Sequence, residues 1–551
     1  GIYNVELIVA NRIHCVDTHS VRWVVSPTIR NFPYSEDFEM GDGNWFAESA
    51  SASQSLLWEW GRDTTSAGFA PNANNNIWGT ALNRAYQASD NAWVYSPCFD
   101  IDALKRPMIH FDYWSHTPSQ EDGAIIEYQR PDGSWRALGK VGRGINWFNE
   151  DFIAGQPGGG NTRPIGWSGV QSDWKNGRYK LDAYRGPNNI VRLRFAFGAF
   201  NISQSAFFDG FAFDNVWIGD RTRNVLLETT SNIDQPNMEL INDYVYNLVY
   251  HTNINRDIIT IQYHTRTPAA DDQFYLNAST ITNVRLIEYG DENPGRAYID
   301  GVHDNAPYSS SLTEQDFEQD MLQDPKFSIT IDTFVHISNT FRMVATVTAL
   351  ENMPTSNYRI YTVITEDSLF YQNSINYPGM LQTVVRKDDG GDNEITRSWQ
   401  AGDSQRFILV WDHSGEGFIN YEEDDFKAVV FIQDKQTEEV FQAATDRDVS
   451  GYWIGVDHTL PDVQDQYNEL MSMVLFPNPT REAFNVRFDA PLSSDYQWRL
   501  VDIRGVDVQT GVAQAGTDLL TINSSNYPTG TYVLVLYNDN VFANRKIIIQ
   551  R

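Results

Sequence analysis

The side chains that most often do chemistry in proteins are spread thinly along this chain. Its ten histidines are scattered, and no two of them stand at a spacing that would make both metal ligands on one element. Asp424 with Asp425, or Glu422 with Glu423, could imitate a glycosidase pair, but they lie in an acidic run typical of a solvated loop or a weak calcium site. No His-Glu-x-x-His, Gly-x-Ser-x-Gly, Gly-x-Gly-x-x-Gly or Walker pattern occurs at a usable spacing. The sequence therefore predicts no catalytic residues and no residues that bind an organic cofactor.

The sequence also offers few groups for thiol chemistry, because the chain holds only two cysteines, Cys15 and Cys98. They fall in different predicted domains and neither belongs to a Cys-x-x-Cys motif, which excludes a disulfide framework. We expect both to be buried structural thiols.

Composition excludes further classes of partner. The 72 acidic and 41 basic residues give a net charge of -31, which repels nucleic acid and anionic lipid and favours divalent cations. Aromatic residues make up 13% of the chain, which argues against disorder. A chain of 551 residues exceeds one hydrophobic core, so we expect three to five domains. No apolar run is long enough for a transmembrane helix.

Strands dominate the elements that must position any site. The opening piece, residues 1–27, contains two alternating stretches, 3–10 and 20–25, which predict a β-hairpin. The pattern of Gly1, Tyr3, Val5, Leu7 and Val9 resembles the last strands of a polycystic-kidney-disease-type immunoglobulin-like domain. That resemblance implies a fragment of a domain whose first half would lie upstream.

Residues 32–220 are rich in Trp, Gly and Asn, with strands expected over 108–114, 124–129 and 190–200. The segment opens with Ser35-Glu36-Asp37-Phe38-Glu39 and closes with Phe207-Phe208-Asp209-Gly210-Phe211-Ala212-Phe213-Asp214-Asn215-Val216. In this order the motifs resemble the jelly roll of the MAM and cleaved-adhesin type, in which bound calcium is common.

The jelly-roll resemblance implies a structural calcium site at Glu39, Asp209 and Asp214, since calcium takes carboxylate and carbonyl oxygens. The alternative is that these carboxylates cap turns and face solvent. The segment's many tryptophans could likewise form a sugar-stacking platform, but a buried aromatic core is the expected role for most of them. They include Trp58, Trp60, Trp78, Trp147, Trp167 and Trp174.

Residues 221–447 change character. A strand at 225–228, an amphipathic helix at 239–251 and a buried strand at 257–264 form a β-α-β order, which predicts parallel pairing. Later strands are expected at 361–367, 384–387 and 428–434. The series resembles the outer membrane protein 28-related family. That resemblance implies a thioredoxin-like domain at 221–325 and an immunoglobulin-like sandwich at 326–447.

This chain departs from that family where Cys-x-x-Cys often follows the first strand. It has Thr229-Thr230-Ser231-Asn232-Ile233-Asp234-Gln235-Pro236 there, and thiol exchange cannot run without a thiolate. The proline that faces the cysteines in such folds also falls out of register, because Pro294 comes one residue early and Gly295 takes its place. We expect a degenerate domain that serves as scaffold or binding surface.

The last pieces are an acidic linker candidate, 448–472, and the segment 473–551. The latter holds Pro477-Asn478-Pro479 near its start, Gly530-Thr531-Tyr532 late, and Lys546 before a final apolar run. These motifs, with alternating strands between them, resemble the type A C-terminal sorting domain of the Bacteroidetes type IX secretion system. The resemblance implies a β-sandwich, with Pro477, Asn478, Pro479, Gly530, Tyr532 and Lys546 as the sorting signal. It also implies the translocon and its outer-membrane shuttle protein as partners.

The predicted fold class is mainly β and multidomain, with β-sandwiches including a jelly roll and one thioredoxin-like α/β domain. The predicted function is that of a non-catalytic secreted or cell-surface protein, exported by the type IX system, that acts in adhesion or surface assembly. Its ligand would be a surface protein or a glycan, and self-assembly into a fibre or layer is a further alternative. A different hypothesis makes the chain the accessory C-terminal region of a larger secreted peptidase or glycoside hydrolase, with its catalytic domain upstream of residue 1.

Overall fold

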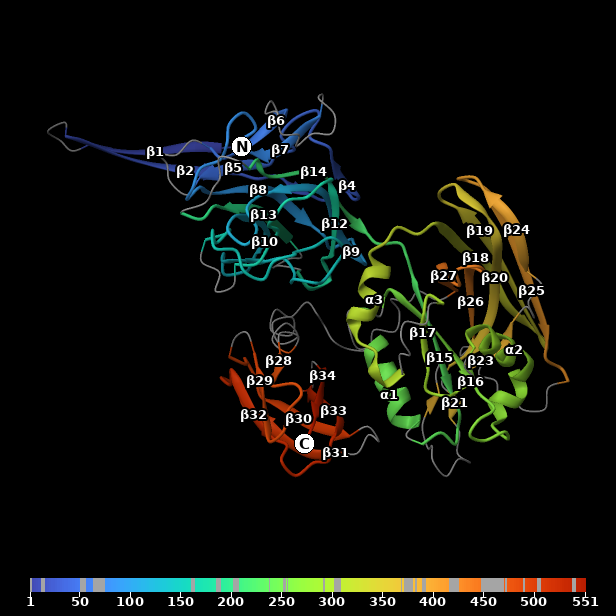
Figure 1. The fold of residues 1–551 in the computed structure, drawn as a ribbon. Helices are drawn as coiled ribbons and strands as arrows, with labels where there is room; N and C mark the ends of the chain where they lie inside the picture. The colour runs from blue at the N-terminus through green and yellow to red at the C-terminus, as the bar shows by residue number, and fades with distance from the viewer. Residues whose placement is uncertain are drawn as a thin grey trace. The chain divides into compact units, whose positions relative to one another are not determined.

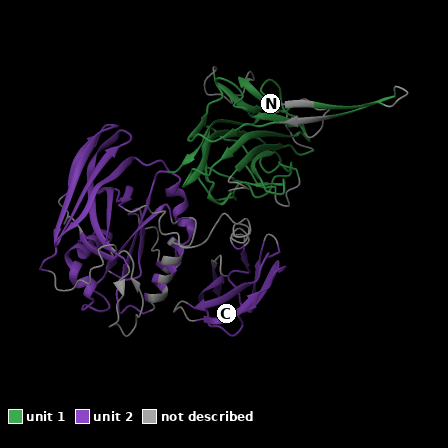
Figure 2. Ribbon diagram, turned by 180° about the vertical axis from the view of Figure 1, so that it is seen from behind, with its two compact units in different colours: residues 1–221 green, residues 222–551 purple. Residues whose placement is uncertain are grey.

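The computed structural model describes most of the chain in two compact units, residues 1–221 and 222–551 (Figures 1 and 2). The described residues are 2–10, 15–49, 56–62, 75–159, 164–184, 190–201, 208–236, 238–250, 254, 256–290, 293–301, 309–367, 369–370, 380–381, 384–388, 393–415, 426–446, 470, 473–488, 491–502, 507–537 and 542–551. The linker predicted at 448–472 and the carboxylate pairs at 422–425 lie outside these ranges, apart from Leu470.

The first unit contains only strands and one short 3₁₀ turn among its described elements. The strands are β1 (Ile2–Ala10), β2 (Val16–Val24), β3 (Thr28–Ile29), β4 (Tyr34–Glu36), β5 (Phe46–Ser49), β6 (Trp58–Arg62), β7 (Asn76–Thr80), β8 (Asn91–Asp100), β9 (Pro107–His116), β10 (Gly123–Gln129), β11 (Trp135–Ala137), β12 (Lys175–Lys180), β13 (Ile190–Gly198) and β14 (Gly210–Asp220).

Strands β3 to β14 form a sandwich of two six-stranded sheets. One has the order β11-β10-β13-β8-β3 with β5 paired to β8, and the other has β12-β9-β14-β7-β6 with β4 paired to β14. Every strand pair in both sheets is antiparallel except β3 with β8. Inward positions alternate with half-exposed ones along β8 and β9, as they must when one face is wet. The sandwich predicted for this piece is confirmed.

Aromatic side chains fill this sandwich. Phe111, Phe195, Phe211 and Phe213 contact one another and the indoles around them, with Phe195 and Phe213 stacked at 4.1 Å between ring centroids. Trp58, Trp78, Trp147 and Trp167 are buried, so the expected core role is confirmed for four of the six tryptophans singled out. Trp60 differs, because 41% of it is exposed.

Strands β1 and β2 form the predicted antiparallel hairpin, with Ile2 opposite Val24 and Ala10 opposite Val16. Cys15, just before β2, is exposed, and Cys98 in β8 is half-buried. The expectation that both thiols are buried is therefore wrong for Cys15. It lies outside the packed sandwich, where no core is available to cover it.

The second unit carries the helices. Its elements before the sorting segment are β15 (Val225–Ser231), α1 (Met238–Tyr250), β16 (Ile258–His264), α2 (Gln273–Tyr289), β17 (Ala297–Ile299), α3 (Glu314–Met321), β18 (Phe327–Ile337), β19 (Thr340–Ala349), β20 (Met353–Glu366), β21 (Leu369–Phe370), β22 (Met380–Leu381), β23 (Val384–Asp388), β24 (Glu394–Trp399), β25 (Ser404–Asp412), β26 (Phe426–Asp434) and β27 (Val440–Thr445).

The predicted β-α-β order is confirmed, because β15 and β16 pair in parallel around α1. The sheet does not stop there. It runs β17-β15-β16-β23-β20-β26-β27, with β24 paired to β20, and so it continues across the predicted domain boundary at 325/326. The strands of the two predicted domains are joined by the parallel pairing of Gln262 in β16 with Val384 in β23.

Both faces of this large sheet are covered. A three-stranded sheet, β18-β19-β25, packs on one face around Phe327, Phe341 and Trp399. Residues on the other face, including Ile261, Val363 and Phe431, form a second core with Ala278 of α2. Strand β26 is buried at all nine positions for this reason, and a strand covered on both faces reads as a continuous apolar run.

The sorting segment folds as a sandwich with its own core. Strands β28 (Val474–Phe476), β29 (Ala483–Arg487) and β32 (Leu519–Asn523) form one sheet. Strands β31 (Asp507–Ala513), β30 (Tyr496–Asp502), β33 (Gly530–Tyr537) and β34 (Phe542–Ile549) form the other. Within the described ranges, none of the helices combines the length and hydrophobicity that crossing a membrane requires.

Candidate functional site

The predicted sorting residues lie around β34, the final strand of the C-terminal sandwich. Asn478 follows β28 and reaches the final strand, β34: its Nδ2 donates to the carbonyl of Lys546 at 3.0 Å, and its Oδ1 accepts from the Ile548 N–H at 2.9 Å. One side-chain amide thus satisfies two backbone groups of β34, much as a neighbouring strand would. Thr480 continues the contact, because its N–H donates to the Ile548 carbonyl at 2.8 Å and its carbonyl accepts from Gln550 at 2.8 Å.

The late motif fixes the other edge of the same strand. Gly530 opens β33 opposite Ile549, and Val533 lies opposite Lys546. The Tyr532 ring is buried, and its hydroxyl donates to the Pro528 carbonyl at 2.9 Å, in the manner of the tyrosine corners of sandwich domains. Pro477, Asn478, Pro479 and Lys546 are all exposed. We name the residues 478–480 and 546–550 the terminal clasp.

The predicted calcium residues are only partly brought together. Asp214 in β14 lies opposite Asp112 of β9, and its carboxylate accepts from the Asn215 N–H at 2.7 Å and from Asn75 Nδ2 at 2.8 Å. Glu39 accepts from the N–H of Asn76, the next residue along from Asn75, at 2.8 Å. Burial, together with the charges of Asp112 and Glu39, raises the pKa of Asp214 to about 6 against the hydrogen bonds of Asn215 and Asn75.

Asp209 belongs to a different place, because its Oδ2 pairs with His116 Nδ1 at 2.6 Å at the start of β14. Asp112, which the sequence analysis missed, takes its position beside Asp214; the strand register between β9 and β14 was the signal that would have found it. Throughout the described ranges, no three His, Cys, Asp or Glu side chains gather as a metal centre would need. The donors around Asp214 are carboxylate and amide oxygens, which is the chemistry that calcium prefers.

The Cys-x-x-Cys position is occupied by buried threonine and serine at the end of β15. Gly295, at a φ of 81°, donates its N–H to the Thr230 carbonyl at 2.7 Å, and the Arg296 N–H donates to Thr230 Oγ1 at 2.9 Å. The turn that holds Pro294 and Gly295 is therefore bonded to the end of β15. The polar groups of Thr230 are used to bond the backbone of this turn to β15.

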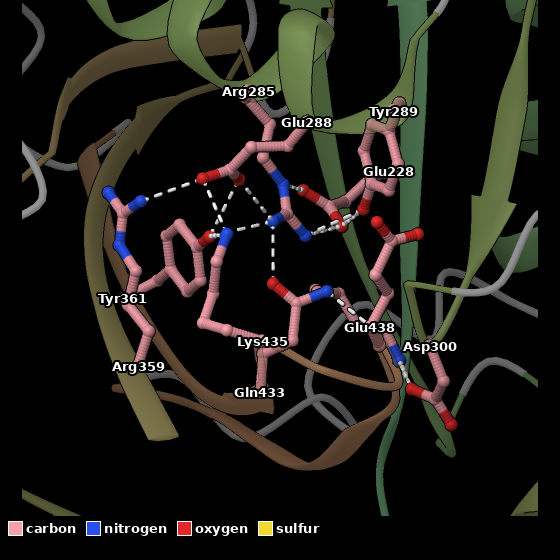
Figure 3. A network of polar contacts seen from close by, with 11 residues as sticks. Glu228, Arg285, Glu288, Tyr289, Asp300, Arg359, Tyr361, Gln433, Lys435 and Glu438 are labelled. Atoms are coloured by element: carbon pink, nitrogen blue, oxygen red, sulfur yellow. Dashed lines mark hydrogen bonds and ion pairs between the residues drawn. The ribbon is translucent and has the colours of Figure 1, made fainter. Parts of the chain in front are cut away.

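A buried ionic network joins α2 to the large sheet (Figure 3). Arg285 of α2 makes a two-pronged contact with Glu228 of β15, at 2.8 Å from Nε and 2.6 Å from Nη2. Its Nη1 donates to Gln433 Oε1 at 2.7 Å and to the Tyr361 hydroxyl at 2.9 Å. The Tyr289 hydroxyl donates to Glu228 as well. The network therefore ties residues from both predicted domains, 221–325 and 326–447.

Glu288 forms the outer part of this network. Its carboxylate accepts from Arg359 at 2.9 Å, from Lys435 at 2.6 Å and from the Tyr361 hydroxyl at 2.8 Å. Burial alone would raise the pKa of Glu288, but Lys435 and Arg285 outweigh it and hold that pKa below its usual value. Burial raises the pKa of Asp300, at the end of β17, to about 7, although Arg223 pairs with it at 2.6 Å. These contacts hold α2 against β15 and β20, so the network serves to hold elements together.

Comparison with known proteins bears first on the C-terminal sandwich, a small β domain of two sheets. Residues 474–550 match the family model described as the secretion system C-terminal sorting domain. This domain marks the chain as a secreted or cell-surface protein that interacts with the type IX secretion machinery. A search of curated proteins found no match.

Among solved structures, HBP35 of Porphyromonas gingivalis aligns with 60% of this chain and 100% of its own, at 10% identity and a TM-score of 0.33. The K1 cleaved adhesin domain of Lys-gingipain from Porphyromonas gingivalis W83 aligns with 35% of this chain and 100% of its own, at 14% identity and a TM-score of 0.21. A domain of the outer membrane lipoprotein Omp28 from Porphyromonas gingivalis covers 22% of this chain and 86% of its own, at 13% identity and a TM-score of 0.17. With TM-scores this low, these similarities carry no assignment.

Proposed function

We propose that this protein is a non-catalytic binding protein of the cell surface, delivered by its C-terminal sandwich and working through the jelly roll formed by β3 to β14. Trp60 is the observation that carries the binding role. It lies on β6, at the edge of its sheet, and is exposed while its neighbours of the same type are buried. Its Nε1 donates to the Phe38 carbonyl at 3.0 Å, so the exposed ring is held in one orientation.

The surroundings of Trp60 have the mixed character of a recognition surface. Met40, two residues after the Phe38 that accepts the Trp60 hydrogen bond, is 96% exposed, and Leu56, four residues before Trp60, is 50% exposed. Arg84 pairs with Glu59, the residue before Trp60, at 3.4 Å and donates to the Leu56 carbonyl at 2.8 Å. An exposed indole held in a fixed orientation suits a sugar ring or an apolar anchor of a protein.

The test is binding of the purified full chain and its Trp60→Ala variant to surfaces coated with glycans or with surface proteins. We expect the variant to lose at least tenfold in apparent affinity, and we expect Phe152→Ala, which removes another exposed ring, to bind normally. Pretreating the surface with periodate or with protease separates a glycan ligand from a protein ligand. Equal binding by Trp60→Ala and the unchanged chain would remove the jelly-roll edge as the binding face.

Export is tested separately. Deleting residues 474–551 should leave the protein inside the outer membrane, and fusing that segment to a periplasmic reporter should carry the reporter to the surface or the medium. Docking of this sandwich on the outer-membrane shuttle is part of the same proposal, and cross-linking from the exposed Lys546 should capture it.

We further propose that a calcium ion stabilises the jelly roll at Asp214 and Asp112, which lie opposite each other on β14 and β9, with amide and carbonyl oxygens as its other ligands and Glu39 as a nearby negative charge. The support is the oxygen-only donor set around Asp214 and the burial of its carboxyl beside two other carboxylates; burial is the main cause of its raised pKa, and the charges of Asp112 and Glu39 add to it.

A further inference from the structure

Two histidines from distant parts of the chain meet at one end of the sandwich formed by β18-β19-β25 and the large sheet. His336 lies near the end of β18, and His413 directly follows β25. Their Nε2 atoms are 2.9 Å apart. A hydrogen bond at this distance needs at least one neutral ring, and either ring can be the donor.

Aromatic neighbours hold both rings in place. His336 stacks on Phe341, with 4.1 Å between centroids and 16° between planes. His413 is 5% exposed and lies against Trp411 at 5.5 Å. The N–H of His413 donates to the Asn339 carbonyl at 3.0 Å, which fixes the backbone from which the ring projects. The two rings are therefore arranged before any ligand arrives.

The separation is close to that of two imidazoles on one metal ion. Two nitrogens bound to Zn²⁺ at about 2.0–2.1 Å with tetrahedral angles lie about 3.3 Å apart. The two Nε2 atoms need to separate by about 0.4 Å to reach that spacing, and the rings need to turn so that both lone pairs point at the ion. Imidazole nitrogens favour zinc, copper and nickel over calcium and magnesium, which prefer oxygen.

We propose that His336 and His413 form a two-histidine site for a divalent transition-metal ion, with its remaining positions left to water or to a donor from a bound molecule. His336 is only half-buried, so the ion reaches the pair from solvent. Both ligands come from the second unit, one from β18 and one from the residue after β25, and the site takes no ligand from the jelly roll or the terminal clasp. With two protein ligands, the bound ion exchanges readily.

The experiment is calorimetric titration of the full chain with ZnCl₂ in excess Ca²⁺, which occupies the many carboxylates. We expect one Zn²⁺ per chain, and at least tenfold weaker binding in both His336→Gln and His413→Gln. His19→Gln is the matched control, because His19 lies on the exposed face of the β1–β2 hairpin, and it should bind like the unchanged chain. Equal Zn²⁺ affinity in all four proteins would overturn the proposal.

A second measurement does not depend on the variants folding. Electron paramagnetic resonance of the unchanged chain with one equivalent of Cu²⁺ should show hyperfine coupling to two imidazole nitrogens. A spectrum with oxygen ligands only would overturn the proposal even if zinc bound, since the metal would then sit on carboxylates.

Discussion

Asp214 shows how one residue can make the stability of a sandwich depend on pH. Its carboxyl is buried beside Asp112 and Glu39, and its pKa is raised from 3.8 to about 6. A group with a raised pKa in the folded state stabilises the fold below its unfolded pKa, and that contribution disappears as the pH rises through the folded value.

We therefore expect the unfolding free energy of the jelly roll to fall between about pH 4 and pH 6 in the absence of calcium. Asp214→Asn should flatten this part of the profile, because the amide does not titrate. Calcium at neutral pH should raise the melting temperature of the unchanged chain and leave that of the variant unmoved. The measurement is thermal unfolding monitored by tryptophan fluorescence, and a calcium shift retained by the variant would contradict the assigned ligand.

In the sorting domain, Asn478 is a single residue on which the stability of the sandwich depends. Asn478→Ala removes both hydrogen bonds to β34 and should destabilise this sandwich by about 1–3 kcal/mol. Asn485→Ala is the control, since the Asn485 side chain is bonded to Thr521 on an exposed strand face. Chemical denaturation gives the free energies, and cell fractionation should show less exported protein for Asn478→Ala alone.

The sequence analysis identified Asn478, Glu39 and Asp214 by residue type and order, but it did not supply their partners. Asn478 bonds the backbone of residues about seventy positions away, and backbone groups carry no sequence signal. Asp112 was missed because its place beside Asp214 follows from strand register. Asp209 was included because the jelly-roll resemblance implies a role for both closing aspartates, but the structure pairs it with His116 at the start of β14.

At the scale of elements, local patterns predicted many of the strands and α1, but they missed α2 and α3 and gave little of the pairing between distant strands. The strand, helix and strand of β15, α1 and β16 were expected from periodicity within forty residues. The junction of β16 with β23 joins residues more than a hundred positions apart, and a non-local pairing of this kind leaves no periodic trace. The thioredoxin-like description of 221–325 stays a prediction, while the large sheet runs through that region into 326–447.

Arg285 holds this composite element together. Arg285→Met should destabilise the second unit by about 3–5 kcal/mol, because Glu228 is then left as a buried carboxylate without its cation. Arg406→Met is the control: its pair with Asp332 is 3.8 Å long and exposed, and its loss should cost less than about 1 kcal/mol. Urea denaturation of the two variants measures the difference, and similar midpoints would show that the network contributes little.

At the scale of the whole molecule, the chain divides at residue 221 into two units with separate cores (Figure 2). We expect residues 1–221 expressed alone to keep the near-ultraviolet circular dichroism of a packed aromatic core. Their melting transition should coincide with one transition in the calorimetric profile of the full chain. Loss of that spectrum in the isolated piece would show that its fold depends on residues 222–551.

The terminal clasp has a mechanical consequence. Thr480 forms a parallel bridge with Ile549, so the segment at which the chain enters the sorting sandwich runs alongside the strand at which it leaves. Tension between the rest of the protein and the C-terminus would load these bonds together in shear, instead of opening them one after another. The sandwich is thus built as a latch that resists a pull along the chain, and a single-molecule pulling experiment on Asn478→Ala should show a lower rupture force. A pull on the C-terminus during export would therefore leave the sorting sandwich folded.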